Sequence, residues 1–385
     1  MPTLSQRIPQ LHASPIREIL AVINRPGMIS FAGGLPSPDS FPEFDLQQVP
    51  KALLQYGASE GEPALREQIC SELNQIGLKC EASQVLVLSG SQQGIDLVAK
   101  LMIDQNTPVA VESPTYLAAL QVFRFFGARF MPLDPTNTRP SERPALCYAI
   151  PTFQNPTGNC YDVGQRQALA RYCEQNRSVL FEDDPYRDLA YDDCDRTPVC
   201  ALMQGGSWVY QGSFSKTLAP GLRLGFLVAS PELLPYLIRL KQAADLHSNR
   251  VSQQLVLQAL QHPQRAARMT QLQHAYRQKR DGFDAALKRH LSPYAEWETP
   301  KGGLFFWLKL KQPTDTQDLL RRAIAKGVAF MPGESFFHAP SSAASYLRLN
   351  FSHADEAATA RGLALLAEEL RLTHCHTAQH WPASA

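Results

Sequence analysis

The chain of 385 residues is long enough for about two or three domains, and hydrophobic residues make up 44% of it against 19% charged residues. This composition excludes a disordered chain and allows a large buried core. The 37 lysines and arginines nearly balance the 36 aspartates and glutamates, and the formal net charge of +1 gives no basic surface for nucleic acid or for an anionic membrane. A small anion can still bind at a local site.

The eight cysteines form no Cys-x-x-Cys pair and no zinc-binding pattern with histidine, so we expect reduced thiols and no metal site. The N-terminus carries prolines and charges where a signal peptide needs an apolar run. No stretch approaches the roughly 18 consecutive apolar residues of a membrane-spanning helix. These features favour a cytoplasmic protein without a membrane segment.

Residues 1–44 are expected to form an N-terminal arm, with a short helix at 14–24 and an irregular Gly/Pro-rich stretch, FAGGLPSPDSFP, at 31–42. From about residue 84 to 230, short β-branched runs alternate with helical segments. The predicted strands are 85–88, 109–111, 129–133, 145–150, 179–181, 208–211 and 223–229. This alternation predicts βαβ units and a mainly parallel sheet, with the carboxyl ends of its strands along one ligand-binding edge.

Beyond this region, residues 262–291 are predicted to form one long helix that connects two domains. The rest of the chain combines predicted strands at 302–310 and 345–351 with predicted helices at 316–327 and 355–372. We therefore predict an α/β protein in three parts. These are the arm (1–44), a large domain that includes the long helix (45–290) and a small α+β domain (291–385).

Polar motifs follow several of the predicted strands, at the expected ligand edge. They are SGSQQG (89–94), SPTY (113–116), QNPTG (154–158), FEDDPY (181–186) and GSFSKTLAPGLRLG (212–225). Neither a Gly-x-Gly-x-x-Gly dinucleotide motif nor a Walker-type Gly-Lys-Ser/Thr sequence is present. Taken singly, each motif also fits an ordinary turn, a surface acidic turn or a solvated basic loop.

Together, the motifs combine features that suit a phosphate, an aldehyde and a cationic ring. SGSQQG places free helix N-terminal N–H groups near a strand end, where they can bind an anion. A lysine that is desolvated beside cations can lose its proton and attack a carbonyl, and neighbouring serines and an arginine suit a phosphate. Two aspartates at the end of a buried strand are costly unless one meets a cation. The combination specifies pyridoxal 5′-phosphate.

In this order, the motifs resemble those of fold-type I, class I/II aminotransferases, which depend on pyridoxal 5′-phosphate. The subgroup with the greatest likeness contains 2-aminoadipate aminotransferases, kynurenine aminotransferase II and the aminotransferase-like domains of MocR regulators. The likeness also includes ISFAGGLPSPDSFP, YGASEGEPALRE, GVAFMPGESF and YLRLNFS, and so extends over nearly the whole chain. It implies a large mainly parallel-sheet domain, a small α+β domain and a homodimer with shared active sites.

The resemblance also implies roles for particular residues. Lys216 would bind the cofactor aldehyde and carry the proton of the substrate α-carbon. Asp183 would pair with the pyridine nitrogen, with Asp184 in support, and Asn155 and Tyr186 would hydrogen-bond the phenolic oxygen of the ring. The remaining cofactor contacts would come from Tyr116, which stacks on the ring, and from the phosphate-binding residues Ser91, Gln92, Ser213, Ser215 and Arg223.

For the substrate, the resemblance implies that Arg348 binds the α-carboxylate, and that Gly34 and Asn155 lie beside it. Tyr56 would reach the phosphate in the neighbouring subunit. Arg17, in SPIREIL, matches a position that can direct an arginine toward a second, distal carboxylate. A solvated surface arginine is the alternative for that residue, and an aromatic or aliphatic substrate would instead meet the apolar residues of the same helix, Ile16, Ile19 and Leu20.

The implied reaction moves the amino group of an L-amino acid to a 2-oxo acid such as 2-oxoglutarate. The donor would be 2-aminoadipate-like, aromatic or branched. One alternative is another pyridoxal 5′-phosphate reaction on the same fold, such as a lyase or decarboxylase reaction. A second is a MocR-type regulatory domain, which a DNA-binding winged helix would precede. The likeness begins at Ile29, which leaves no room for such a segment in this sequence.

Overall fold

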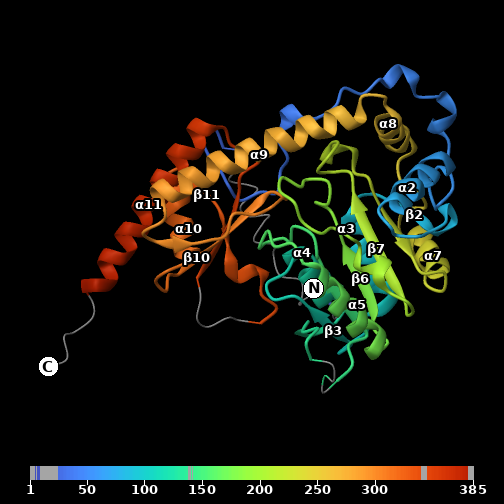
Figure 1. Cartoon of the computed structure of the whole chain (residues 1–385), viewed down its shortest axis with the longest axis horizontal. Helices are drawn as coiled ribbons and strands as arrows, with labels where there is room; N and C mark the ends of the chain where they lie inside the picture. Colours follow the sequence, from blue (N-terminus) through green and yellow to red (C-terminus); the bar gives the residue numbers. More distant parts are fainter. Residues whose placement is uncertain are drawn as a thin grey trace.

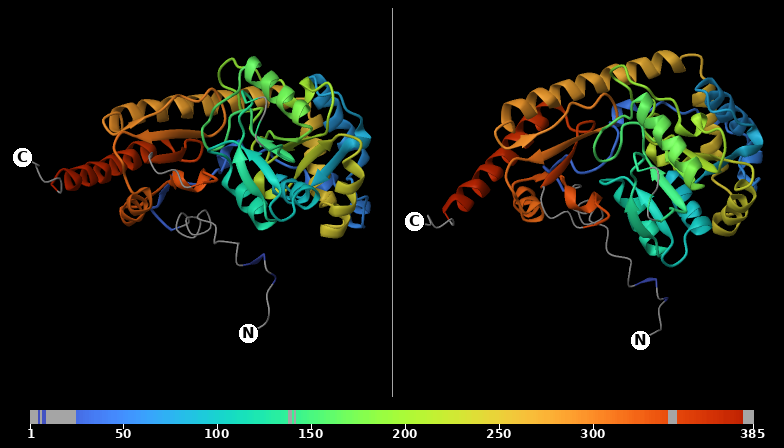
Figure 2. Two further views of the ribbon diagram at one scale, coloured as in Figure 1. Left: turned by 90° about the horizontal axis from the view of Figure 1, so that it is seen from below. Right: turned by 60° about the horizontal axis from the view of Figure 1, so that its bottom comes forward.

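The computed structural model describes residues 5, 7–8, 25–137, 140, 142–339 and 345–379, with side chains described as far as residue 373. Figure 1 shows a larger unit around β6 and β7 and a smaller unit around β10, with the long helix α9 (Arg265–His290) extending along both. The two views of Figure 2 show the same two units side by side beneath this helix. None of the helices in the described ranges is long and apolar enough to cross a membrane.

The larger unit contains a seven-stranded sheet in the order β2–β8–β7–β6–β5–β3–β4. Its strands are β2 (Val85–Leu88), β3 (Pro108–Val111), β4 (Arg129–Pro132), β5 (Leu146–Ala149), β6 (Val179–Asp183), β7 (Trp208–Ser213) and β8 (Gly225–Ala229). The pairs among β3, β4, β5, β6 and β7 are all parallel, as the alternating sequence pattern predicts. The fold class is therefore α/β with a mainly parallel central sheet.

Strand β8 departs from this arrangement, because it is antiparallel to both of its neighbours, β2 and β7. The connection from β7 contains only a loop and the short 3-10 helix η6 (Pro220–Leu222), whereas a parallel neighbour requires a long crossover. The predicted strand 223–229 also begins too early, because Arg223 has a left-handed conformation (φ 49°, ψ 51°) and ends η6. The strand itself starts at Gly225.

Alternate residues of each strand pack on opposite faces of the sheet. Val85 and Val87 lie in a core with α2, α5, α6 and α8, whereas Leu86 and Leu88 lie in a core with α3, α4 and α7. These helices are α2 (Pro63–Gln75), α3 (Ser91–Met102), α4 (Leu117–Phe125), α5 (Val163–Asn176), α6 (Val199–Leu202), α7 (Leu234–Asp245) and α8 (Arg250–Gln261). Burial of both faces explains why the strands are apolar at nearly every position.

The smaller unit contains a four-stranded antiparallel sheet in the order β12–β13–β10–β9. Its elements are β9 (Ala295–Glu296), β10 (Phe305–Leu310), α10 (Thr316–Ala325), β11 (Val328–Ala329), β12 (Met331–Pro332), β13 (Tyr346–Asn350) and α11 (Glu356–Gln379). A third core joins β10 and β13 to α9 and α11. The long helix and the α+β unit agree with the sequence prediction; the domain boundaries at 44 and 290 stay a prediction.

The segment assigned to the N-terminal arm contributes to the smaller unit. Strand β1 (Ile29–Ser30) pairs in parallel with β11, and Phe31 is fully buried, with its ring edge-on to Phe283 of α9 (centroids 5.3 Å apart). Short 3-10 helices occur at η2 (Pro38–Ser40), η3 (Leu46–Gln48), η4 (Lys51–Leu54), η5 (Ala82–Gln84) and η7 (Gly333–Phe336). The predicted helix at 14–24 lies outside the described residues.

Candidate active site

The five polar motifs lie where strands of the large sheet end. SGSQQG follows β2, SPTY follows β3 and QNPTG follows β5, while FEDDPY and GSFSKTLAPGLRLG begin within β6 and β7. The smaller unit reaches the same edge. The Thr115 amide donates a hydrogen bond to the Phe336 carbonyl (2.9 Å), and the Tyr186 ring packs edge-on against Phe305. The carboxyl ends of the parallel strands and the smaller unit therefore enclose one site.

Asp183 is the last residue of β6, and strand alternation places its side chain on the face covered by α3, α4 and α7. Phe181, two residues earlier, belongs to the core of that face. Asp183 Oδ2 accepts a hydrogen bond from Tyr148 Oη (2.8 Å), and Oδ1 accepts one from Gln211 Nε2 (2.9 Å). Burial raises the pKa of Asp183 to about 6, although both hydrogen bonds oppose the rise. A cation at this carboxylate would restore its ordinary ionisation.

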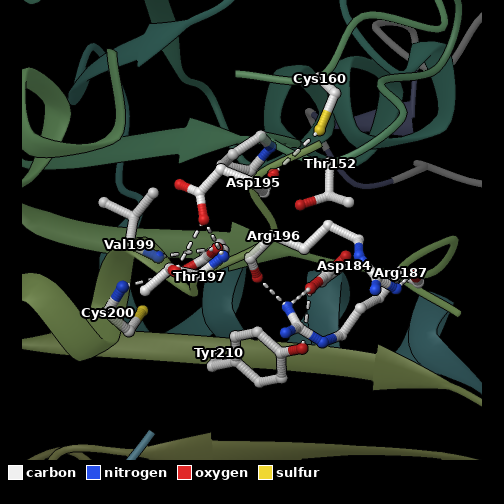
Figure 3. Close-up of polar contacts among 12 residues, drawn as sticks. Thr152, Cys160, Asp184, Arg187, Asp195, Arg196, Thr197, Val199, Cys200 and Tyr210 are labelled. Atoms are coloured by element: carbon white, nitrogen blue, oxygen red, sulfur yellow. Dashed lines mark hydrogen bonds and ion pairs between the residues drawn. The ribbon is translucent and has the colours of Figure 1, made fainter. Parts of the chain in front are cut away.

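The acidic neighbours of Asp183 lie on the opposite face of the sheet. Asp184 Oδ2 accepts a hydrogen bond from Tyr210 Oη (2.9 Å) and forms an ion pair with Arg187 (3.3 Å), as Figure 3 shows. Glu182 accepts hydrogen bonds from two backbone amides at the start of α6 (3.0 and 2.9 Å). Asp184 therefore has its own cation, while Asp183 has only neutral donors.

Lys216 lies in the loop after β7, with its amine in a cationic environment. Lys216 Nζ donates a hydrogen bond to the Gly34 carbonyl (2.8 Å). Burial, together with the positive charges of Arg348 and Arg223, lowers the pKa of Lys216 to about 8. An appreciable fraction of such an amine is neutral near neutral pH, which a nucleophile that attacks an aldehyde requires.

Arg348, in β13, is buried without a carboxylate partner in the part of the chain that the structure describes. Its Nη1 donates to Asn155 Oδ1 (2.9 Å) and its Nη2 to the Ala32 carbonyl, while Nε has no hydrogen-bond partner. The guanidinium carbon lies 4.2 Å from the centre of the Phe305 ring and 5.0 Å from that of Phe336. Burial lowers the pKa of Arg348 to about 10. The side chain can therefore bind a carboxylate inside the site.

Arg223 lies against the turn that begins α3. A Cβ on Gly90 would lie 2.4 Å from Arg223 Nη2, and a Cβ on Gly225 would lie 2.9 Å from the Ser91 amide nitrogen. Gly90 also has a φ of 85°, which side chains rarely adopt. The two glycines leave room for an arginine, a serine and a helix N-terminus to meet, and this combination suits a phosphate.

Two tyrosines, Tyr116 and Tyr186, lie near Asp183, and Tyr186 also packs against Phe305 of the smaller unit. Tyr116 Oη donates to Gln92 Oε1 (3.5 Å), and burial, with a smaller contribution from the negative charge of Asp183, raises the pKa of Tyr116 to about 12. Burial also raises the pKa of Tyr186, although a hydrogen bond with Asn155 opposes the rise. Both phenols therefore stay protonated and can act as hydrogen-bond donors.

The remaining predicted site residues divide into two groups. Ser213 is the last residue of β7 and Ser215 lies in the loop that follows, where the Ser215 amide donates to Ser213 Oγ (3.2 Å). Tyr56 lies apart from the cluster, with 76% of its surface exposed and its ring edge-on to His247 (5.9 Å). Arg17 lies outside the described residues.

Several buried residues behind the site are not identified by sequence reasoning. Tyr148 and Gln211, which hold Asp183, lie inside predicted strands, where the pattern indicates only core positions. Glu112 accepts hydrogen bonds from the Ile150 amide (2.9 Å) and Tyr161 Oη (2.8 Å) and so holds both ends of the loop that contains QNPTG. The only sequence signal is a polar residue within or next to an apolar strand.

These charges fit the groups of pyridoxal 5′-phosphate. Asp183 accepts hydrogen bonds only from neutral groups, so its charge is free to pair with a pyridinium nitrogen. The turn at Gly90 suits the phosphate, and the Lys216 amine suits the aldehyde. The unpartnered Nε of Arg348 is left for the carboxylate of an amino acid. The fold and the site define a fold-type I enzyme that uses pyridoxal 5′-phosphate.

Comparison with known proteins agrees with this definition. Residues 41–364 match the aminotransferase class I and II family, and the chain belongs to that family. It is 36% identical to a 2-aminoadipate transaminase of Thermus thermophilus, over 94% of this chain and 95% of the relative. It is 32% identical to an aromatic-amino-acid aminotransferase of Thermococcus litoralis, over 95% of this chain and 94% of that one.

Solved structures show the same similarity. The α-aminoadipate aminotransferase of Thermus thermophilus, in complex with N-(5′-phosphopyridoxyl)-L-leucine, has a TM-score of 0.87 at 34% identity and covers 97% of this chain and 98% of its own. The kynurenine aminotransferase of Pyrococcus horikoshii has a TM-score of 0.88 at 31% identity, over 96% of this chain and 97% of its own.

The pKa of Asp183 predicts how pH affects the ligand-free protein. Its folded-state value, raised to about 6, exceeds the unfolded value of about 3.9. Between these values the folded state binds the proton more tightly, so this carboxyl lowers the free energy of unfolding as pH rises from about 4 to about 6. Asp183→Asn should remove this contribution and flatten the pH dependence of urea unfolding midpoints. The exposed Asp193→Asn should keep the parent profile, and an unchanged profile in Asp183→Asn would contradict the assignment.

Proposed function

We propose that this protein transfers the amino group of an L-amino acid to a 2-oxo acid, with 2-oxoglutarate as an acceptor. One observation carries the proposal: the Lys216 amine, which donates a hydrogen bond to the Gly34 carbonyl (2.8 Å), lies near Arg348 and Arg223, whose charges help to lower its pKa to about 8. Neither arginine has an ion-pair partner among the described residues. The arginines suit a phosphate and an α-carboxylate, and the amine suits the aldehyde between them.

In the proposed arrangement, the cofactor is held by residues at the carboxyl ends of several strands of the large sheet. Asp183 would pair with the ring nitrogen, Tyr186 and Asn155 would bind the phenolic oxygen, and Tyr116 would stack on the ring. The phosphate-binding residues are Ser91, Gln92, Ser213, Ser215 and Arg223, with Tyr56 of a second copy. Pyridoxal 5′-phosphate supplies an aldehyde for the amino group and a cationic ring that draws electrons from the substrate α-carbon.

The chain itself orients the substrate and moves one proton. Arg348 binds the α-carboxylate, with Asn155 bound to the same guanidinium (2.9 Å), and the Gly34 carbonyl accepts a hydrogen bond from Lys216 Nζ (2.8 Å). With pyridoxal 5′-phosphate bound, Lys216 Nζ would hold its aldehyde and would carry the proton that leaves the substrate α-carbon. Its lowered pKa lets it accept and release this proton near neutral pH.

Lys216→Ala should abolish the absorbance band of lysine-bound cofactor and lower kcat by several orders of magnitude, because it removes the amine that is proposed to hold the aldehyde and to carry the proton. Absorbance spectra and single-turnover kinetics measure both effects. The parent enzyme, mixed with an amino acid alone, should release one equivalent of 2-oxo acid per site and then stop until a second 2-oxo acid is added. An unchanged spectrum in the variant would contradict the role of Lys216, and continued turnover without a 2-oxo acid would indicate a lyase or decarboxylase.

We further propose that the enzyme is a homodimer with shared active sites. Large apolar side chains are exposed along residues 35–56, among them Leu46 (65%) and Leu54 (73%), and Tyr56 lies at the end of this stretch. Exposed apolar residues that cluster in one segment are typical of an interface, and a second copy covers such a segment symmetrically. Tyr56 would then extend into the partner's phosphate site.

Leu54→Glu should therefore shift the protein from dimer to monomer and weaken retention of the cofactor. Sedimentation velocity and the cofactor content after dialysis measure these effects. Tyr236→Glu, at an exposed apolar residue on α7, is the matched control and should change neither. A parent enzyme that sediments as a fully active monomer would contradict both the dimer and the role of Tyr56.

We also propose a cytoplasmic location. The seven cysteines that the structure describes are free, including Cys70 and Cys80, whose sulfurs lie 3.8 Å apart. Free thiols this close persist in a reducing compartment. Fractionation of cells that express the protein tests the location, and recovery outside the cytoplasm would contradict it.

For the amino donor, we propose a 2-aminoadipate-like, aromatic or branched amino acid, with Arg17 as the contact for a distal carboxylate. Relatives named for 2-aminoadipate and for aromatic amino acids support both classes. A hydrogen bond between charged groups contributes about 1.5–3 kcal/mol, or roughly ten- to a hundredfold in specificity.

A panel of twenty amino acids, 2-aminoadipate and kynurenine, each assayed with 2-oxoglutarate, tests this assignment. Arg17→Ala should lower kcat/KM for dicarboxylic donors by roughly ten- to a hundredfold and leave other donors unchanged. Arg348→Lys, the control, should lower kcat/KM for every donor, because all of them carry an α-carboxylate. Equal values in Arg17→Ala and the parent for dicarboxylic donors would show that Arg17 does not select the substrate.

A further inference from the structure

An arginine at the start of α8 holds the segment that carries Tyr56. Arg250 is the first residue of this helix. Its Nη1 donates hydrogen bonds to three backbone carbonyls, those of Ala52 (3.1 Å), Gln55 (3.0 Å) and Tyr56 (3.2 Å). These carbonyls lie at and beyond the end of η4, where a helix offers its carbonyl groups few partners of its own. One guanidinium group therefore fixes the backbone that leads to the Tyr56 side chain.

The orientation of this guanidinium group is set by Glu62, the residue that precedes α2. Arg250 Nε donates to Glu62 Oε1 (2.6 Å) and Arg250 Nη2 donates to Glu62 Oε2 (3.2 Å), so the ion pair is bidentate. The Glu62 amide in turn donates to Gln253 Oε1 (2.7 Å), one turn further along α8. Because Nε and Nη2 are held by the carboxylate, Nη1 is directed to the carbonyls of residues 52–56.

Gly57, the residue after Tyr56, leaves the space that Arg250 occupies. A Cβ on Gly57 would lie 2.8 Å from both Cδ and Nε of Arg250 and 3.2 Å from Glu62 Oε1. The φ of Gly57 lies outside the left-handed region, so alanine can adopt the same backbone conformation. The absence of a side chain at this position therefore serves the close approach of the arginine rather than the freedom of the backbone.

Burial contributes little to the position of this segment. All residues of 51–56 except Leu53 are exposed. The Tyr56 ring lies edge-on to that of His247 (centroids 5.9 Å apart), and the Tyr56 amide donates to Gln55 Oε1 (2.9 Å), which is a contact within the segment itself. The hydrogen bonds from Arg250 are therefore the main tie between residues 52–56 and α8.

We propose that Arg250 is a positioning residue for cofactor binding in the neighbouring subunit, because it holds the backbone from which Tyr56 extends to the partner's phosphate site. This inference rests on the proposed homodimer and on the proposed role of Tyr56 in it. A tyrosine on a segment that is already ordered loses less conformational freedom when it binds a phosphate, so the affinity for the cofactor is higher. Arg250 contributes to this affinity only through Tyr56.

A double-mutant cycle separates this role from a general effect on stability. It combines Arg250→Gln with Tyr56→Phe in the full-length chain, and equilibrium dialysis of each holoenzyme gives the Kd of pyridoxal 5′-phosphate. Arg250→Gln should raise this Kd roughly tenfold in the parent and change it less than about twofold in Tyr56→Phe. The same factor in both backgrounds, or the parent Kd in Arg250→Gln, would overturn the proposal. The parent Kd in Tyr56→Phe would overturn the cross-subunit role of Tyr56 itself, and with it this inference.

Gly57→Ala tests the same contact without removal of the arginine. Its Cβ should displace Arg250, so the Kd should rise as much as in Arg250→Gln, and the two substitutions combined should raise it no further. Arg265→Gln is the matched control, because Arg265 also donates to a glutamate, Glu72 (2.7 Å), and to a backbone carbonyl, that of Leu260 (3.3 Å). This variant should keep the parent Kd. The parent Kd in Gly57→Ala, or an equal rise in Arg265→Gln, would overturn the proposal.

Discussion

Burial of charge without countercharge is the constraint on which this structure depends. Asp183, Lys216 and Arg348 lie at one edge of the large sheet, and none of them forms an ion pair with another described residue. Each shows the cost as a shifted pKa: burial raises that of Asp183 and lowers those of Lys216 and Arg348. A ligand with a cationic ring, an aldehyde and a carboxylate relieves all three. Binding of cofactor and substrate therefore stabilises the folded state, in which these three charged side chains have no ion-pair partner of their own among the described residues.

The groups around these charges keep them in place without neutralising them. Asp183 is held by two neutral donors, Tyr148 and Gln211, which fix its position and leave its charge for a ligand. Asp184 shows the contrary case, because its ion pair with Arg187 already compensates its charge. The difference follows from strand alternation, which continues from Asp183, the last residue of β6, to Asp184 and sends the two side chains to opposite faces of the sheet. A shift of one residue in register would exchange the two aspartates and leave the site without its anion.

Much of this arrangement could be predicted from the sequence, because the signals are local. Short β-branched runs separated by helical segments predict the mainly parallel sheet, and the polar motifs after the runs predict where the site lies. The long helix is predicted at 262–291 and is found at Arg265–His290. The glycines and serines around Lys216 and Arg223 indicate a phosphate because their chemistry depends on residue type and spacing.

The remainder depends on contacts between distant parts of the chain, which leave no local pattern. The antiparallel direction of β8 follows from the short connection after β7, while its sequence is apolar like that of a parallel strand. The pairing of Ile29 with Val328 brings the N-terminal arm to the smaller unit, although the two residues are far apart in sequence. Tyr148 and Gln211 lie inside strands, where a polar side chain does not reveal whether it faces a site or satisfies a neighbour.

The loop of Asn155 combines both kinds of information. Its sequence, QNPTG, predicts a fixed turn, but the turn is held by Glu112 and Arg166, two buried charged residues outside the motif. Each satisfies backbone groups of the loop, so neither can be replaced by an apolar residue without leaving buried amides or carbonyls unpaired. Asn155 in turn contacts Arg348 of the smaller unit (2.9 Å). The position of Arg348 is thus set by a chain of hydrogen bonds that begins in the core of the larger unit.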